Sequence, residues 1–182
     1  MNALKFWVFV SFLCVPPLKM AGKTVLPDSC GNDSVNFDVK TEKGRPEPAA
    51  PGAGKALLVV SESFAQNQGF CLGCKVTTRV GLDGKWIGAN NGNSYFAVEI
   101  DPGEHHLCVG WQSVMGKLKS QVGLAGFTAQ AGSTYYYESA VKITSYGNNS
   151  GDERELHLAP LSADDGQYRV KAWRLATWKS KE

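Results

Sequence analysis

Apolar and polar residues alternate along much of the chain between Lys55 and Leu158, and a period of two predicts β-strands. Ala56–Val60 is instead a continuous apolar run, which is typical of a strand buried on both faces. The expected strands are Ala56–Val60, Val76–Leu82, Lys85–Ala89, Ser94–Ile100, Glu104–Gln112, Val122–Ala129, Ser133–Tyr146 and Glu153–Leu158. Because no segment between them has helical periodicity, the pattern indicates an all-β fold, an antiparallel β-sandwich of about seven or eight strands.

Turn residues separate these strands. Asp83-Gly84 predicts a tight hairpin, because glycine adopts a positive φ without steric conflict. Asp101-Pro102-Gly103 predicts a second turn, in which proline presets φ and glycine accepts a positive φ. Gly147–Gly151 predicts a third. Turns therefore account for most of the glycine excess, which is 20 of 182 residues against about 7% in average usage.

Residues 1–54, which precede the predicted β-sandwich, are predicted to be a signal peptide followed by an N-terminal arm and a linker. Residues 1–22 have the form of a signal peptide, because a lysine precedes about ten apolar residues, too few to span a bilayer. Residues 23–54 form an N-terminal arm, with one alternating strand around Phe37, and a Pro-rich linker. The β-sandwich domain then covers residues 55–182, and no other apolar segment approaches the length of a membrane span.

The C-terminal end of the domain predicts a short helix. Ser162 is a suitable N-cap, and the acidic residues that follow it favour the positive end of the helix dipole. Tyr168, Ala172, Leu175 and Ala176 then fall at helical spacing. Tyr168, Val170 and Ala172 also alternate, but the cap favours the helix.

The net charge and the predicted signal peptide limit the kinds of partner and the location that we expect for this protein. Lys and Arg number 19 against 17 Asp and Glu, a net charge of +2, which gives no electrostatic basis for a nucleic-acid partner. The signal peptide predicts an exported protein, periplasmic or secreted. Cys14 lies in the apolar run, but bulky Leu13 before it disfavours lipid anchoring there.

Export also decides how the cysteines are interpreted. Removing Cys14 with the signal leaves Cys30, Cys71, Cys74 and Cys108, which in an oxidising compartment suggest two disulfides with three connectivities. We prefer Cys30–Cys108 with Cys71–Cys74, because the first bridge closes a long loop and ties the arm to the domain. An alternative is a zinc or hydrolase site that uses Cys71 and Cys74 with His105 or His106.

One ordered set of motifs is more specific than composition. It consists of Val80–Gly88, Tyr95–Val98, Pro102–Leu107 and Gly132–Tyr136. This order resembles the bacterial domain of unknown function 2846 family and, more distantly, PEGA-type surface modules. The resemblance covers roughly Lys55 to Leu158 and implies an exported β-sandwich to which no catalytic residues are carried over. In this pattern Gly88 is expected to end a short strand.

These observations favour a non-enzymatic binding or structural module of the cell envelope, with an unknown protein or glycan as partner and with no cofactor or metal. The metal or hydrolase site above is one alternative, and a carbohydrate- or peptide-binding module is another. For such a binding surface the candidates are Trp86, Asn90, Asn91 and Trp111, although Trp111 also fits core packing. Loops at one end of the sandwich are the expected place for a ligand.

Overall fold

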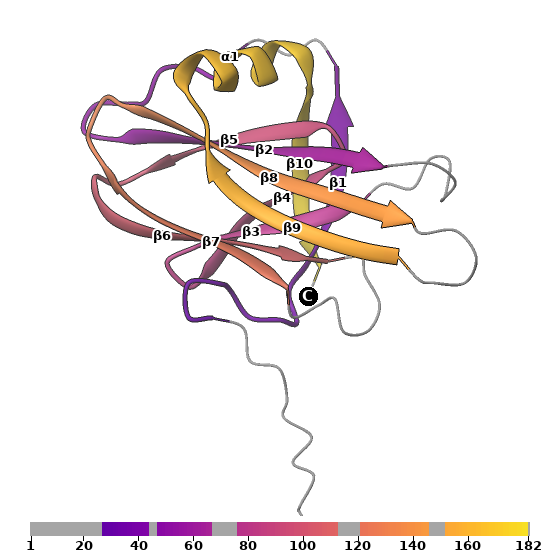
Figure 1. The fold of residues 1–182 in the computed structure, drawn as a ribbon. Helices are drawn as coiled ribbons and strands as arrows, with labels where there is room; N and C mark the ends of the chain where they lie inside the picture. Colours follow the sequence, from indigo (N-terminus) through magenta and orange to yellow (C-terminus); the bar gives the residue numbers. More distant parts are fainter. Residues whose placement is uncertain (1–26, 44–46, 67–75, 113–120, 146–151, 182) are drawn as a thin grey trace, which may run out of the picture.

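The computed structural model describes residues 27–43, 47–66, 76–112, 121–145 and 152–181. These residues form two facing β-sheets and one short helix (Figure 1). The elements are β1 (Asn36–Glu42), β2 (Ala56–Gln66), β3 (Thr77–Leu82), β4 (Lys85–Asn91), β5 (Ser94–Ile100), β6 (Gly103–Trp111), β7 (Val122–Ala129), β8 (Thr134–Ser145), β9 (Asp152–Pro160), α1 (Ala163–Ala172) and β10 (Arg174–Lys181). The predicted β-rich, sandwich-like fold with a C-terminal helix is confirmed.

The larger sheet has six strands in the order β1-β10-β5-β2-β8-β9, and the smaller has four in the order β4-β3-β6-β7. The smaller sheet is antiparallel, as expected. The larger sheet is mixed, because β8 pairs with β2 and β10 pairs with β5 in parallel. The expectation of a fully antiparallel sandwich with seven or eight strands is therefore wrong in strand number and in these two pairings.

The apolar run at the start of β2 is buried on both faces, as its sequence predicted. Leu58 and Val60 are fully buried in the core between the two sheets. Leu57 and Val59 belong to a second apolar cluster with Val170 of α1. The helix thus covers the outer face of the larger sheet and creates a second layer of burial there.

Both predicted turns that fall in the described ranges are present. Asp83 and Gly84 have φ values of 49° and 83° and join β3 to β4 as a hairpin. Gly103 has a φ of 139° at the second turn. This second turn crosses between sheets, because β5 lies in the larger sheet whereas β6 pairs with β3 and β7. The turn expected at Gly147–Gly151 lies outside the described residues.

The strand expected around Phe37 is β1, and it is an edge strand of the larger sheet. Seven residue pairs join it antiparallel to β10, from Asn36 with Lys181 to Glu42 with Leu175. Phe37 is buried. A strand from the predicted arm is therefore part of the sandwich, while residues 47–54 of the linker contain no strand.

The C-terminal helix is shorter than its spacing suggested. Ser162 caps it as predicted, and its hydroxyl oxygen accepts from the Asp165 N–H at 3.1 Å. The helix ends at Ala172, and the residues that were expected to extend it form β10 instead. The buried helix positions are Gly166 and Val170, whereas Tyr168 is 67% exposed. Within the described ranges, no helix is long and apolar enough to cross a membrane.

Gly88 does not end a strand, because β4 continues to Asn91. Its missing side chain leaves room for two rings from the larger sheet. A Cβ at this position would lie 2.9 Å from the Trp178 ring and 3.0 Å from the Phe96 ring. These rings meet edge to face, with centroids 4.7 Å apart, and they close the sandwich between β4 and β10.

Candidate functional site

A pocket of about 630 Å³ lies at the end of the sandwich where β4 turns into β5. The ends of β1 and β2, the β4–β5 turn, the last turn of α1 and the start of β10 form its wall. The lining residues are Thr41, Lys43, Phe64, Asn91, Gly92, Asn93, Lys171, Ala172, Trp173 and Arg174. Such a volume is typical of pockets that bind small molecules. We call it the basic pocket, after its three cationic side chains.

The β4–β5 turn is held in place from behind by the protein interior. Gly92 has a φ of +67°, a conformation that side-chain-bearing residues rarely adopt. Its N–H donates to Glu62 Oε1 at 2.7 Å. Asn93 Oδ1 accepts from the Phe64 N–H at 3.0 Å, which ties the turn to the end of β2. This wall of the basic pocket is therefore arranged before any ligand arrives.

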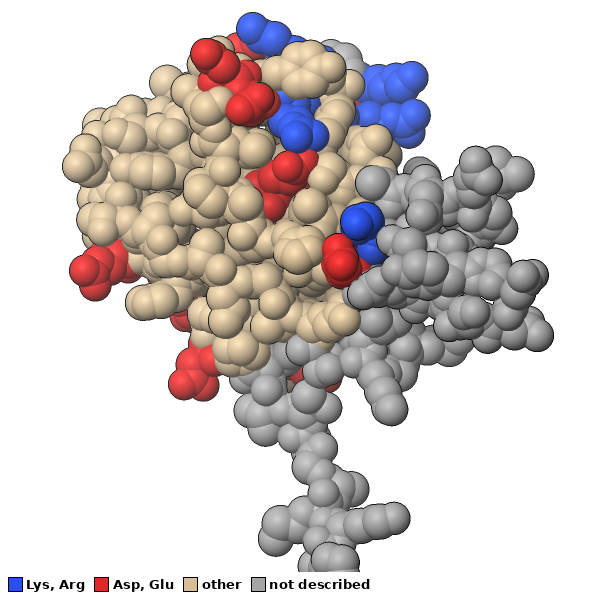
Figure 2. All heavy atoms as spheres, in the orientation of Figure 1, with Lys and Arg blue, Asp and Glu red and all other residues tan. Residues whose placement is uncertain are grey.

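The charge in the basic pocket is one-sided. Lys43, Lys171 and Arg174 line it, and none of the lining residues that the structure describes carries a carboxylate. Lys171 is paired with Glu47, with 3.3 Å between Nζ and Oε1. Among the described residues, Lys43 and Arg174 have no carboxylate within ion-pair distance. Figure 2 shows Lys and Arg side chains gathered at the upper right of the molecule, beside the helix.

Trp173 follows the helix and is fixed by its neighbours. Its backbone N–H donates to the Arg169 carbonyl at 2.9 Å and completes the C-terminal end of the helix. The Arg169 guanidinium lies 4.4 Å from the centroid of the Trp173 ring. Arg169 in turn pairs with Glu138 of β8 at 2.9 Å. The indole is thus a positioned, half-buried wall of the basic pocket.

Behind the turn lies a buried carboxyl group, Glu62, which is 0% exposed. Its Oε2 accepts from the Thr78 N–H at 3.2 Å and is in short contact with Thr78 Oγ1. The hydroxyls of Thr78 and Ser139 lie 3.4 Å apart. Glu62 therefore joins β2 to β3 across the two sheets and also holds Gly92 of the pocket wall.

Burial raises the pKa of the Glu62 carboxyl from 4.5 to about 8. The hydrogen bonds from Thr78 and Gly92 favour the charged form, but they offset only part of this effect. At pH 7 the carboxyl is therefore mostly protonated. A strongly shifted carboxyl next to a pocket is a feature that often marks functional sites.

The structure separates the four residues predicted as a binding surface. Asn91 lines the basic pocket, and its Nδ2 donates to Thr77 Oγ1 at 2.8 Å. Asn90 and Trp111 are buried, with 0% and 1% exposure. The Trp86 ring is half-buried, and its Nε1 donates to the Asn32 carbonyl at 2.7 Å. Only Asn91 is thus placed to meet a ligand in this pocket.

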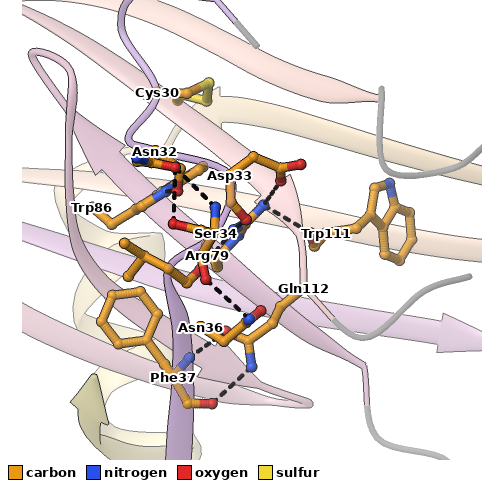
Figure 3. A network of polar contacts seen from close by, with 12 residues as sticks. Cys30, Asn32, Asp33, Ser34, Asn36, Phe37, Arg79, Trp86, Trp111 and Gln112 are labelled. Atoms are coloured by element: carbon orange, nitrogen blue, oxygen red, sulfur yellow. Dashed lines mark hydrogen bonds and ion pairs between the residues drawn. A yellow bond between two sulfur atoms is a disulfide. The ribbon is translucent and has the colours of Figure 1, made fainter. Parts of the chain in front are cut away.

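Trp86 belongs to a polar network that holds the N-terminal segment, residues 27–37, against the smaller sheet (Figure 3). Arg79 of β3 is its centre and is 2% exposed. Its guanidinium donates to the carbonyls of Asp33 at 3.0 Å and Val35 at 2.7 Å and pairs with the Asp33 carboxylate at 3.0 Å. Its Cζ also lies 4.4 Å from the Trp86 ring centroid.

Two further connections hold the same segment. The Gln112 amide exchanges hydrogen bonds with the backbone N–H and carbonyl of Phe37, both at 2.7 Å. Cys30 and Cys108 form a disulfide, with 5.2 Å between their Cα atoms, as the sequence predicted. The network around Arg79 therefore fastens an N-terminal segment and has a structural character.

Replacing Arg79 with methionine is expected to lower the free energy of unfolding by about 3 kcal/mol, because the carbonyls of Asp33, Val35 and Trp111 lose a charged donor while the apolar stem is kept. Urea unfolding measures the loss. Lys85→Met, at an exposed position of β4, is the control and should change stability by less than about 0.5 kcal/mol. A loss below about 1 kcal/mol for Arg79→Met would show that the network contributes little.

The alternative metal or hydrolase site is not assembled in the described part of the chain. Cys71 and Cys74 lie outside it, and their predicted disulfide or metal role stays a prediction. His105 lies near the β3–β4 hairpin, at the opposite end of β4 from the basic pocket. His106 is exposed. Among the described residues there is no cluster of three or more His, Cys, Asp or Glu side chains that could hold a metal ion.

Both ring nitrogens of His105 are already engaged. Nδ1 lies 2.7 Å from Asp83 Oδ2, and Nε2 lies 2.7 Å from the Asp101 carbonyl oxygen. Burial lowers the pKa of His105, but these hydrogen bonds and the nearby carboxylate charges outweigh that effect and raise it above its usual value of 6.5. The contacts are those of a protonated imidazole that holds two turns together.

The chain matches no family model, no curated protein and no solved structure. The assignment of function therefore depends on the geometry of the site. Sequence reasoning missed Lys43 and Arg174 because they lie far apart along the chain and belong to no motif. A local signal for the site was Glu62, a charged residue that follows the apolar run of β2 after Ser61.

Proposed function

We propose that this chain is an exported, non-enzymatic binding module whose partner is a component of the cell envelope. The observation that carries the proposal is the basic pocket, because its β4–β5 wall is anchored to the interior through Gly92 and Asn93. A wall that is ordered in advance lowers the entropic cost of binding. The expectation that export places the chain in the envelope comes from residues 1–22.

The pocket favours binding over the metal or hydrolase alternative. A hydrolytic or metal site built on His105 would have to break both of its existing contacts, to Asp83 and to the Asp101 carbonyl. The basic pocket, in contrast, combines volume, aromatic walls and polar groups, which is the usual composition of a ligand site. The bridge between Cys30 and Cys108 supports an oxidising compartment.

The proposal is tested by filling the pocket without changing its charge. Ala172 is exposed and lines it, so Ala172→Trp should block a ligand. Ala163→Trp, at the other end of the same helix and away from the pocket, is the matched control. The full chain is titrated with a panel of purified envelope glycans and peptide fragments while the amide signals of Gly92 and Asn93 are followed by NMR.

We expect at least one panel member to shift these two signals in a saturable way. Its affinity should fall at least tenfold in Ala172→Trp and stay within about twofold in Ala163→Trp. The proposal fails if no panel member shifts the signals of the basic pocket. It also fails if the two tryptophan variants bind equally well.

A further inference from the structure

The basic pocket has a composition that points to one class of ligand. The three cationic side chains among its described lining residues come from three separate parts of the chain, with Lys43 just after β1, Lys171 in the last turn of α1 and Arg174 at the start of β10. Cations on separate elements converge on one space only because the sheet and the helix bring them there. Since no carboxylate is found among the described lining residues, an anionic group is the complement of these charges.

Arg174 supplies a group that can hold such an anion. Arg174 offers a planar guanidinium that suits a carboxylate, which it can hold with two parallel hydrogen bonds. The Arg174 side chain is exposed. The backbone nitrogen of Arg174 lies 3.5 Å from the Asn93 carbonyl oxygen, so its backbone is joined to the β4–β5 turn. The guanidinium therefore starts from an ordered backbone position at the edge of the pocket.

The remaining lining groups suit a sugar ring. Trp173 and Phe64 supply aromatic surface, and Asn91, Asn93 and Thr41 supply amide and hydroxyl groups. Aromatic rings pack against the apolar face of a ring-shaped ligand, while amides and hydroxyls match its hydroxyl groups. Its volume of about 630 Å³ lies in the range of pockets that hold small ligands, which favours one or two rings over an extended acidic peptide.

We propose, resting on the proposed function, that the basic pocket binds an acidic saccharide, with the carboxylate of a uronic-acid residue between Arg174 and Lys43 and a sugar ring against Trp173. Lys171 is shared with Glu47 and contributes less to the anion. Because the cations face solvent, binding weakens as the salt concentration rises.

The test compares ligands that differ in charge alone. Oligosaccharides of galacturonate, glucuronate and mannuronate are titrated into the full chain by calorimetry, each beside its methyl ester, which has the same rings without the carboxylate charge. A short poly-aspartate peptide is the third ligand. We expect at least one uronate to bind, its ester to bind at least tenfold more weakly, and the peptide to bind more weakly than the uronate.

Variants locate the site. Arg174→Ala and Lys43→Ala should each weaken uronate binding about tenfold, while Lys40→Ala, an exposed lysine of β1 outside the pocket, should leave it within about twofold. Equal binding of uronate and ester, preference for the peptide, or an effect of Lys40→Ala equal to that of Arg174→Ala overturns the proposal. If a neutral panel member fills the pocket and no uronate binds, the acidic-saccharide assignment fails and the binding function stands. If nothing binds, both fail.

Discussion

Replacing Glu62 with glutamine should make the free energy of unfolding less dependent on pH, with the variant less stable than the wild type at pH 5 and more stable at pH 9. The carboxyl has a pKa of about 8 in the folded protein and 4.5 as its ordinary value. Between these values the folded chain holds a proton that the unfolded chain has released. The contribution of Glu62 to the free energy of unfolding is therefore fully present below pH 4.5 and is lost as the pH rises through 8. This loss is at most about 5 kcal/mol.

The lower stability of the Glu62→Gln variant at pH 5 has a separate cause. Both carboxyl oxygens of Glu62 accept backbone N–H groups, one from Thr78 and one from Gly92. An amide has a single acceptor oxygen, so one of these N–H groups faces an NH₂ group and loses its partner. Such a loss is worth about 1–3 kcal/mol and does not depend on pH. The two stability curves should therefore cross between pH 5 and pH 9.

Urea unfolding at intervals from pH 4.5 to pH 9 measures both curves. Glu104→Gln is the matched control, because Glu104 is exposed on β6 and the same substitution there removes the same charge. His105, whose pKa is raised, titrates in the wild type and in both variants, so it cancels in the difference. Parallel curves for the wild type and Glu62→Gln would show that Glu62 is ionised in the fold and that its burial does not control its charge.

Removing the disulfide is expected to lower the free energy of unfolding by about 4–5 kcal/mol. Cys30 and Cys108 are 78 residues apart in sequence, and closing a loop of that length restricts the unfolded chain by about this amount in the chain-entropy model. Both cysteines are buried. A Cys30→Ala/Cys108→Ala double variant, compared with the wild type by urea unfolding, measures the loss.

Reductant provides the control for this measurement. Added to the double variant, it reports only what any other disulfide bond of the chain contributes, and added to the wild type it should reproduce most of the loss. The segment near Cys30 keeps the hydrogen bonds of Arg79 and Trp86, so the folded structure should persist without the bridge. A loss below about 1 kcal/mol would mean that these contacts already restrict the segment in the unfolded state or make the bridge redundant.

Local patterns predicted the elements whose neighbours reinforce them. Ser94–Ile100 and Val122–Ala129 are strands with the predicted bounds. Asp83-Gly84 forms its hairpin because positive φ values are a local property of those residues. Ser162 caps α1 because its hydroxyl reaches an N–H three residues along.

Patterns failed where two periods compete. The residues after Ala172 fit a helix, yet Arg174–Lys181 is a strand. Pairing with β1 over seven residue pairs decides this, because it satisfies the backbone groups of both strands and buries Ala176. A partner more than a hundred residues away along the chain leaves no trace in the local period.

What the sequence by itself determined is the β-rich class, most strands, the tight turns and the helix cap, each of which depends on neighbouring residues. It also favoured the Cys30–Cys108 bridge among three connectivities, because the list of cysteines is short. Only the tertiary structure decided the mixed sheet, the burial of Glu62 and the basic pocket. Lys43, Gly92 and Arg174 meet there because β10 returns between β1 and β5, and that pairing is set by packing and hydrogen bonds between distant segments.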